Sequence, residues 1–69
     1  MGEEMKFFAY LLEYYADYKG KSTKKVLEEW DQHQITQIIY DNYWCYHTER
    51  LENAFEDIDS LLATGKHAW

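Results

Sequence analysis

One histidine, one threonine and two aspartates are the residues whose types and order could support catalysis. Thr48 follows His47 directly, and Asp57 and Asp59 come later in the same half of the chain. A histidine beside a carboxylate can transfer protons near neutral pH, so His47 with Asp57 or Asp59 is a candidate acid–base pair. No nucleophile or group of oxyanion donors accompanies it. A histidine at a helix end, followed by aspartates that cap the next helix, explains the same pattern. We therefore favour a structural role and predict that the protein is not an enzyme.

Residues that could bind a metal are widely spaced along the chain. The candidates are His33, Cys45, His47 and His67, of which only Cys45 and His47 are near neighbours. Structural zinc sites use pairs of closely spaced ligands, so we predict no metal site and no cofactor. The single cysteine cannot form a disulfide within the chain and is typical of a reducing compartment. Because it lies between two aromatic residues, we expect its thiol to be buried or half-buried.

The charge of the chain argues against nucleic acid and membranes as partners. The formal net charge is −6, with 13 acidic residues against 7 Lys and Arg. Binding to DNA and to anionic lipid depends on Lys and Arg. The basic cluster between Lys19 and Lys25 is interspersed with Gly, Ser and Thr, which is typical of a solvated loop. No apolar run approaches the roughly 20 residues of a membrane span, and we expect a cytoplasmic protein.

Aromatic residues are the strongest signal in the sequence. Three Trp, seven Tyr and three Phe make up 19% of the chain, and each such ring can bury about 150–250 Å². The core of a domain this small cannot enclose all of them, so we expect some to form an exposed patch that binds another macromolecule. The candidates for this patch are Tyr10, Tyr14, Tyr18, Tyr40 and Trp44. Of these, Tyr10 and Tyr40 are expected to point outward because they lie off the main apolar stripes.

The apolar periodicity predicts helices along most of the chain. Residues 3–19 form the first, with Phe7, Leu11, Tyr14 and Tyr18 on one of two adjacent apolar stripes and Gly20 as its C-cap. A second helix begins at a cap provided by Ser22 or Thr23 and ends near residue 32. A short break near residues 33–34 precedes a third helix over 36–46. That segment is rich in β-branched and aromatic residues, so a strand remains an alternative there.

The last third of the sequence predicts one more helix and a tail. The helix covers roughly residues 50–63 or only the second half of that range, with Asn53, Asp57 and Asp59 each able to cap its start. Gly65 is expected to end it, and the tail 65–69 is expected to be loose unless Trp69 docks on the domain. Together these elements predict an all-α fold, a small bundle of three to four helices. It would form a single domain over residues 1–69 with an ordered core of about 3–64.

Several short motifs occur in an order that resembles a known family. They are an E-Y…K-G-x-S-x-K-x-V opening over residues 13–26, a central His47-Thr48, and a closing Glu56-Asp57-Ile58-Asp59. The chain resembles, over about residues 5–63, the bacterial family catalogued as domain of unknown function 3791. This resemblance implies a small, acidic, helical protein. Because such proteins are often encoded beside an ADP-ribosyltransferase-like toxin gene, it also implies an antitoxin-like or accessory role. The glycine usual between the last two motifs is replaced by residues 49–52, which favour a helical continuation.

These observations lead to one main functional hypothesis. We expect a non-enzymatic protein-interaction module that binds a protein partner, such as a co-encoded toxin-like enzyme, through an aromatic patch with an acidic rim. A homodimer through part of the same surface is left open. One alternative is an acidic mimic of nucleic acid that occupies a basic groove of its partner. Another is a small enzyme that uses His47 with Asp57 or Asp59.

Overall fold

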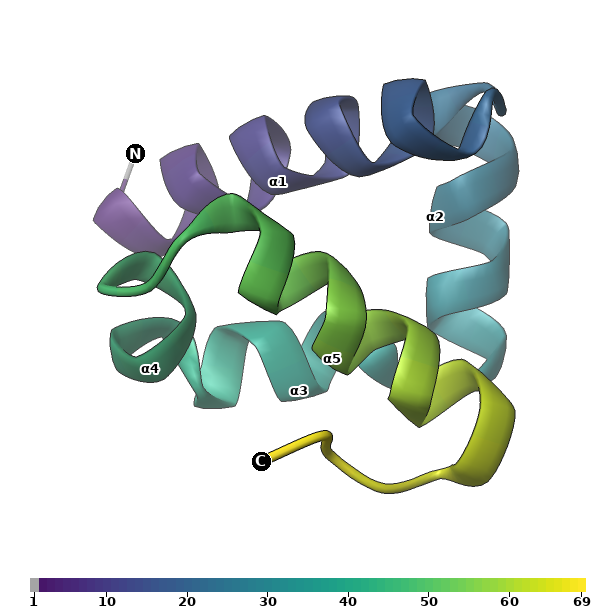
Figure 1. The fold of residues 1–69 in the computed structure, drawn as a ribbon. Helices are drawn as coiled ribbons and strands as arrows, with labels where there is room; N and C mark the ends of the chain where they lie inside the picture. Colours follow the sequence, from purple (N-terminus) through teal and green to yellow (C-terminus); the bar gives the residue numbers. More distant parts are fainter. Residues whose placement is uncertain (1) are drawn as a thin grey trace.

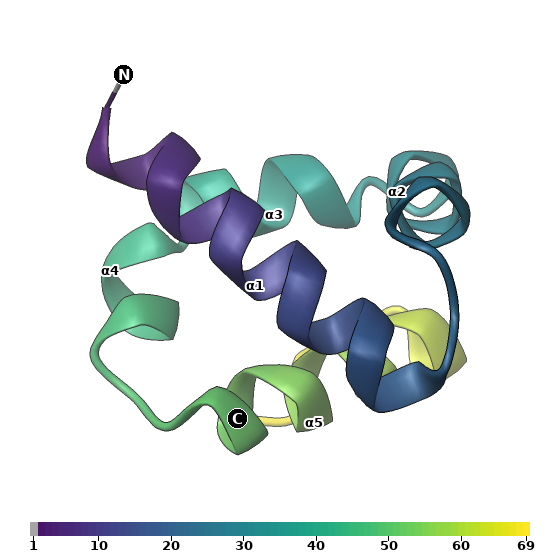
Figure 2. The same ribbon diagram turned by 90° about the horizontal axis from the view of Figure 1, so that it is seen from above.

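The protein forms five α-helices and no strand over residues 2–69, which are the residues that the computed structural model describes. The helices are α1 (Glu3–Lys19), α2 (Thr23–Gln32), α3 (Ile35–Asp41), α4 (Tyr43–His47) and α5 (Leu51–Thr64). Helices α2 to α5 follow one another around a circuit, and α1 crosses over it (Figures 1 and 2). The expected all-α fold is confirmed, and the strand alternative for residues 36–46 is wrong.

Helix α1 has the predicted bounds and buries part of its apolar arc. Gly20 ends the helix in the left-handed region (φ 68°), and the N–H of Lys21 donates to the Ala16 carbonyl at 2.9 Å. Leu11, Tyr15 and Ala16 are buried against the other helices. The apolar arc of this helix spans about half its circumference, so one edge of it remains in solvent. Tyr14 and Tyr18, which the sequence predicts as members of an exposed aromatic patch, lie on that edge.

Helix α2 and the break after it also follow the prediction. The Ser22 side chain accepts a hydrogen bond from the Lys25 N–H at 3.1 Å, which satisfies one free donor of the first turn. The helix ends at His33. Gln34 then adopts a positive φ of 57°, which is uncommon for a residue other than glycine, and the chain turns into α3. Figure 1 shows α2 and α3 meeting at this turn.

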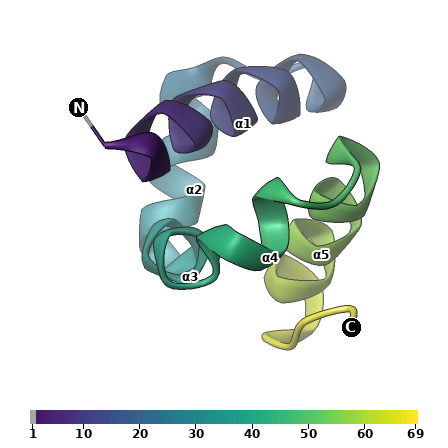
Figure 3. The same cartoon turned by 90° about the vertical axis from the view of Figure 1, so that its left-hand side faces the viewer.

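The helix predicted over residues 36–46 is divided into α3 and α4 at Asn42. This residue is non-helical (φ −113°, ψ 26°), and its side-chain amide donates to the Ile38 carbonyl at 2.9 Å. Its backbone N–H donates to the same carbonyl at 3.0 Å. An asparagine side chain that competes for backbone groups in this way favours a turn over continued helix. The chain therefore bends between the two short helices (Figure 3).

Helix α5 begins at Leu51, within residues 49–52, which the sequence predicted to continue a helix without a break. Arg50 is extended (ψ 149°) and precedes the helix without a side-chain cap, so residues 49–52 do not continue α4 into α5. The three predicted caps, Asn53, Asp57 and Asp59, lie inside α5 instead. Gly65 ends the helix with a φ of 77°, as predicted. The following residues 66–69, here called the tail segment, fold back toward α5 (Figure 1).

The core is the space that α1 encloses with the other helices. Its centre is Trp30 of α2, which is fully buried and contacts the rings of Phe8 and Tyr15. The remaining buried apolar residues come from every helix: Leu11, Ala16, Val26, Ile35, Ile39, Tyr46, Ala54, Ile58 and Leu61. Within residues 2–69, no helix is long and apolar enough to cross a membrane.

Candidate functional site

The aromatic residues divide between core and surface as the sequence predicts. Tyr15, Trp30 and Tyr46 are buried. Five other rings are about half exposed or more: Tyr10 (48%), Tyr14 (52%), Tyr18 (59%), Trp69 (58%) and Trp44 (73%). The expectation that this chain has more ring surface than its core encloses is confirmed.

Three of the five predicted patch residues lie together along one edge of α1. Tyr10, Tyr14 and Tyr18 recur every four residues and therefore fall on one side of the helix. The rings of Tyr10 and Tyr14 lie 4.7 Å apart between centroids. The Tyr18 ring stacks on Phe55 of α5, with centroids 4.8 Å apart and planes at 20°. We call this surface, Tyr10, Tyr14, Tyr18 and Phe55, the tyrosine face.

Acidic residues border the tyrosine face at two places. Glu13 and Asp17 line a shallow hollow with Tyr14. Glu52, Glu56 and Asp59 line a second hollow with Tyr18 and Phe55. Glu13, Asp17, Glu52 and Glu56 are all exposed. The predicted combination of exposed rings and an acidic rim is thus present on this surface.

The other two predicted patch residues lie elsewhere. Tyr40 was expected to point outward, but it is half-buried because its ring packs on Phe8 with centroids 5.1 Å apart. Trp44 lies on α4, where its exposed ring contacts that of His47 at 4.8 Å. The expectation for Cys45 was wrong, since its thiol is exposed. In the short helix α4, Tyr46 points into the core and its neighbours Trp44 and Cys45 face solvent.

His47 and Thr48 make local contacts at the end of α4. The Nδ1 atom of His47 lies 2.9 Å from the Tyr43 carbonyl oxygen, and the two rings stack with centroids 4.2 Å apart. The Thr48 hydroxyl donates to the Trp44 carbonyl at 2.9 Å. Among the hydrogen bonds and ion pairs of residues 2–69, none joins His47 to Asp57 or Asp59. His47 thus lies at a helix end, as the structural interpretation predicts, but the capping role predicted for Asp57 or Asp59 is wrong, because both lie inside α5.

Asp57 is instead joined to another histidine. This carboxylate is 1% exposed, and its Oδ2 atom lies 2.8 Å from Nδ1 of His67 in the tail segment. It also accepts hydrogen bonds from the Tyr46 hydroxyl and from the Ala68 N–H, the latter at 2.5 Å. Burial and then the hydrogen bond to Asp57 raise the pKa of Tyr46 well above its ordinary value of 10.0. Sequence alone did not point to His67, because only the fold brings the tail segment to this position.

Asp59 joins α1 to α5. Its Oδ1 atom accepts a hydrogen bond from the Tyr15 hydroxyl at 2.6 Å and lies 3.0 Å from Nζ of Lys19. Burial, followed by this hydrogen bond, raises the pKa of Tyr15 well above 10.0, so the phenol stays protonated at neutral pH. Asp59 is thus held by Tyr15 and Lys19, and neither of these residues contacts Asp57 in the hydrogen bonds and ion pairs of residues 2–69.

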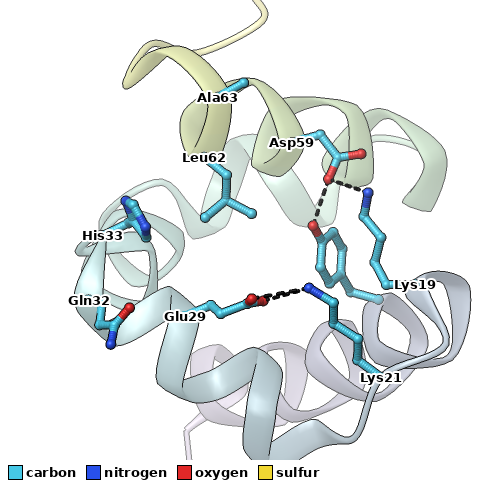
Figure 4. Close-up of a pocket in the computed structure, with 9 residues that line it drawn as sticks. Lys19, Lys21, Glu29, Gln32, His33, Asp59, Leu62 and Ala63 are labelled. Carbon is cyan, nitrogen blue, oxygen red and sulfur yellow. Dashed lines mark hydrogen bonds and ion pairs between the residues drawn. The ribbon is translucent and has the colours of Figure 1, made fainter.

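A polar hollow of about 630 Å³ opens beside Asp59 (Figure 4). Lys21 crosses its floor to pair with Glu29 at 3.1 Å, while Leu62 and His33 line the far side. The lysines in this hollow, Lys19 and Lys21, each already pair with a carboxylate. Within residues 2–69 there is also no group of three or more His, Cys, Asp or Glu side chains that could hold a metal ion.

One protein family matches most of the chain. Its residues 6–64 match the model of a family described as a protein of unknown function (DUF3791). The chain belongs to this family. The match runs from α1 through the end of α5, which makes the five helices the DUF3791 domain and leaves the tail segment outside it. Searches of curated proteins and of solved structures gave no match.

Proposed function

We propose that this DUF3791 protein is a non-enzymatic interaction module that binds a partner protein through the tyrosine face. One observation supports this most strongly: Tyr10, Tyr14 and Tyr18 present half-exposed rings in a single row, extended by Phe55. A small soluble domain rarely exposes such a contiguous apolar surface unless that surface binds something.

The chemistry of these rings suits a protein interface. Tyrosine combines a large apolar ring with a polar hydroxyl, which is why it is enriched where proteins meet. The rings are already positioned by a long helix and by mutual contacts at 4.7 and 4.8 Å. Little side-chain freedom is therefore lost on binding, which favours affinity.

The acidic rim indicates what the partner surface looks like. Glu13, Asp17, Glu52 and Glu56 surround the face with negative charge, and the chain as a whole carries −6. Complementary charges speed association and exclude wrong partners. We therefore propose a partner with an apolar depression bordered by Lys and Arg.

The biological role that we propose is regulatory. The resemblance set out above implies an antitoxin-like protein that acts on a co-encoded enzyme within the cytoplasm. A tyrosine face with an acidic rim is compatible with covering a basic surface of such an enzyme.

Site-specific photocrosslinking tests the proposal in the native cell. A photoreactive phenylalanine analogue replaces Tyr14 on the face, or Lys24 in α2 as a matched exposed control. We expect one discrete cross-linked protein from position 14 and none of the same mass from position 24. Equal labelling from both positions would contradict the proposal. A partner that duplex DNA displaces would favour the acidic nucleic-acid mimic instead.

A further inference from the structure

Asp57 is a buried carboxylate with three hydrogen-bond partners, and none of them belongs to the tyrosine face. It lies inside α5, 1% exposed, where a carboxylate is unfavourable unless charged or polar donors surround it. Three donors do so: the Tyr46 hydroxyl, Nδ1 of His67 and the Ala68 N–H. The carboxylate is therefore satisfied only when the tail segment is in place.

The tail segment contacts this carboxylate much as a bound peptide would. Two of the three donors belong to it, one from a side chain and one from the backbone. Trp69 adds an apolar contact, since its ring meets the edge of Tyr46 at 5.2 Å and stacks on His67 at 4.2 Å between centroids. Trp69 is nonetheless 58% exposed. The segment lies on the surface of the helices and contributes no residue to the buried apolar core.

A short turn at the end of α5 places the tail segment beside Asp57. Gly65 adopts a left-handed conformation, and the Ser60 hydroxyl donates to the Lys66 carbonyl at 2.8 Å. The Lys66 N–H donates to the Thr64 hydroxyl at 3.1 Å. The segment then runs back beside α5 (Figure 1). Both of these side-chain hydrogen bonds are exposed, and exposed hydrogen bonds open more readily than a packed core.

The surface around Asp57 has the charge of a site for a basic segment. Glu49, Asn53 and Glu56 line a hollow together with Asp57, Ala68 and Trp69. The two glutamates are exposed and negatively charged, so they attract a cationic residue that approaches Asp57.

We propose that Asp57 and Tyr46, with the acidic edge formed by Glu49 and Glu56, are a peptide-binding socket, and that the tail segment occupies it as an internal ligand. The external ligand is a protein segment in which a His, Lys or Arg precedes an aromatic residue by two positions, as His67 precedes Trp69. The side-chain cation or imidazole contacts Asp57, an intervening backbone N–H donates to the same carboxylate, and the aromatic ring packs on Tyr46. The tail segment lies outside the matched family span, whereas the socket lies within it.

Displacement of the tail segment by a peptide in trans tests this socket. The probe is a fluorescent peptide, Thr-Gly-Lys-His-Ala-Trp, and the proteins are the full chain and its His67→Ala/Trp69→Ala variant. The tethered tail competes at a high local concentration in the wild type, so we expect the variant to bind the peptide at least about tenfold more tightly.

Two controls assign the binding to the socket. Adding Asp57→Asn to the variant is expected to weaken binding more than about tenfold, whereas adding Glu28→Gln, which changes an exposed carboxylate of α2, is expected to leave it unchanged. A peptide with Ala in place of both His and Trp is expected not to bind. A helical variant, checked by circular dichroism, that shows no binding at millimolar peptide would overturn the proposal.

The wild-type chain provides a second test should the variant fail to fold. The ring signals of His67 are followed by nuclear magnetic resonance while unlabelled peptide is added in excess. Displacement is expected to move these signals to the positions of a solvent-exposed histidine. Signals that remain fixed at saturating peptide would overturn the socket. This result is separate from the fate of the tyrosine face, because neither experiment uses Tyr10, Tyr14 or Tyr18.

Discussion

Replacing Tyr46 by phenylalanine measures how much of the domain's stability depends on its buried carboxylate. The substitution keeps the ring, and hence its contact with Trp69, but removes the hydroxyl that donates to Asp57. A hydrogen bond to a charged group contributes about 1.5–3 kcal/mol net. Asp57 keeps its donors in the tail segment, so we expect a loss of free energy of unfolding near the middle of this range, about 2 kcal/mol.

That loss is large for a chain of 69 residues. A domain of this length has a total free energy of unfolding on the order of 3–10 kcal/mol. A change of about 2 kcal/mol should lower the melting temperature by about 8–16 °C. Urea unfolding gives the free energy when followed by circular dichroism at 222 nm (about the α-helix minimum) and by tryptophan fluorescence, to which the buried Trp30 contributes.

A matched substitution separates the hydrogen bond from a general effect of losing a hydroxyl. Tyr10→Phe removes the hydroxyl of a ring that is 48% exposed, and we expect it to change the free energy of unfolding by less than about 0.5 kcal/mol. If Tyr46→Phe were no more destabilising than Tyr10→Phe, the proposed role of Tyr46 in satisfying Asp57 would be refuted.

Three further predictions use the same unfolding assay. The pKa of Tyr15 is raised in the folded state, so its contribution to the free energy of unfolding is fully present below about pH 10. Above that pH the free energy of unfolding should fall by about 1.4 kcal/mol per pH unit because of this residue. Tyr15→Phe should reduce that alkaline slope by the same amount, and an unchanged slope would contradict the assigned shift. Gly20→Ala should cost about 1–2 kcal/mol, since a left-handed φ disfavours any Cβ although none would clash there. Gly2→Ala, at an ordinary φ of −74°, should cost far less. Ser22→Ala should cost about 1 kcal/mol through the lost N-cap, and a neutral result would show that the cap is not formed in solution.

The regular helices were predictable because their signals are local. Gly20, Ser22 and Gly65 each act through their own backbone conformation or through a bond to a residue within one helical turn. Such signals are present in the sequence regardless of how the helices pack. The bounds of α1 could therefore be given to the residue, and those of α2 nearly so, with its cap left between Ser22 and Thr23.

The division between α3 and α4 was not predicted, because the residue that causes it, Asn42, is not a recognised helix breaker like Gly or Pro. Asn42 stands in a run of apolar and aromatic residues that contains no Gly or Pro. Only the structure shows that its side chain bonds to the Ile38 carbonyl and turns the chain. The start of α5 lies close to the predicted residue 50, but none of the predicted caps forms it, because Arg50 precedes the helix without a side-chain cap.

The candidate sites depend on tertiary contacts, which local signals in the sequence do not reveal. Tyr10, Tyr14 and Tyr18 were predicted as patch residues and are exposed, but Tyr40, predicted to point outward, packs on Phe8. Sequence reasoning paired Asp57 with His47, although His67 lies equally far from Asp57 along the chain. The histidine beside Asp57 is His67, which reaches the carboxylate only after the chain reverses at Gly65.

The affinity of the cross-linked partner for tyrosine-face variants tests the interaction proposal most directly. Titration calorimetry would compare the wild type, Tyr14→Ala/Tyr18→Ala and the exposed control Lys24→Ala with that purified partner. Truncating two rings at the centre of an interface should remove at least about 2 kcal/mol of binding free energy, which is about a 30-fold rise in Kd. The control should bind like the wild type. Equal affinity of all three proteins would place the interface elsewhere and contradict the account.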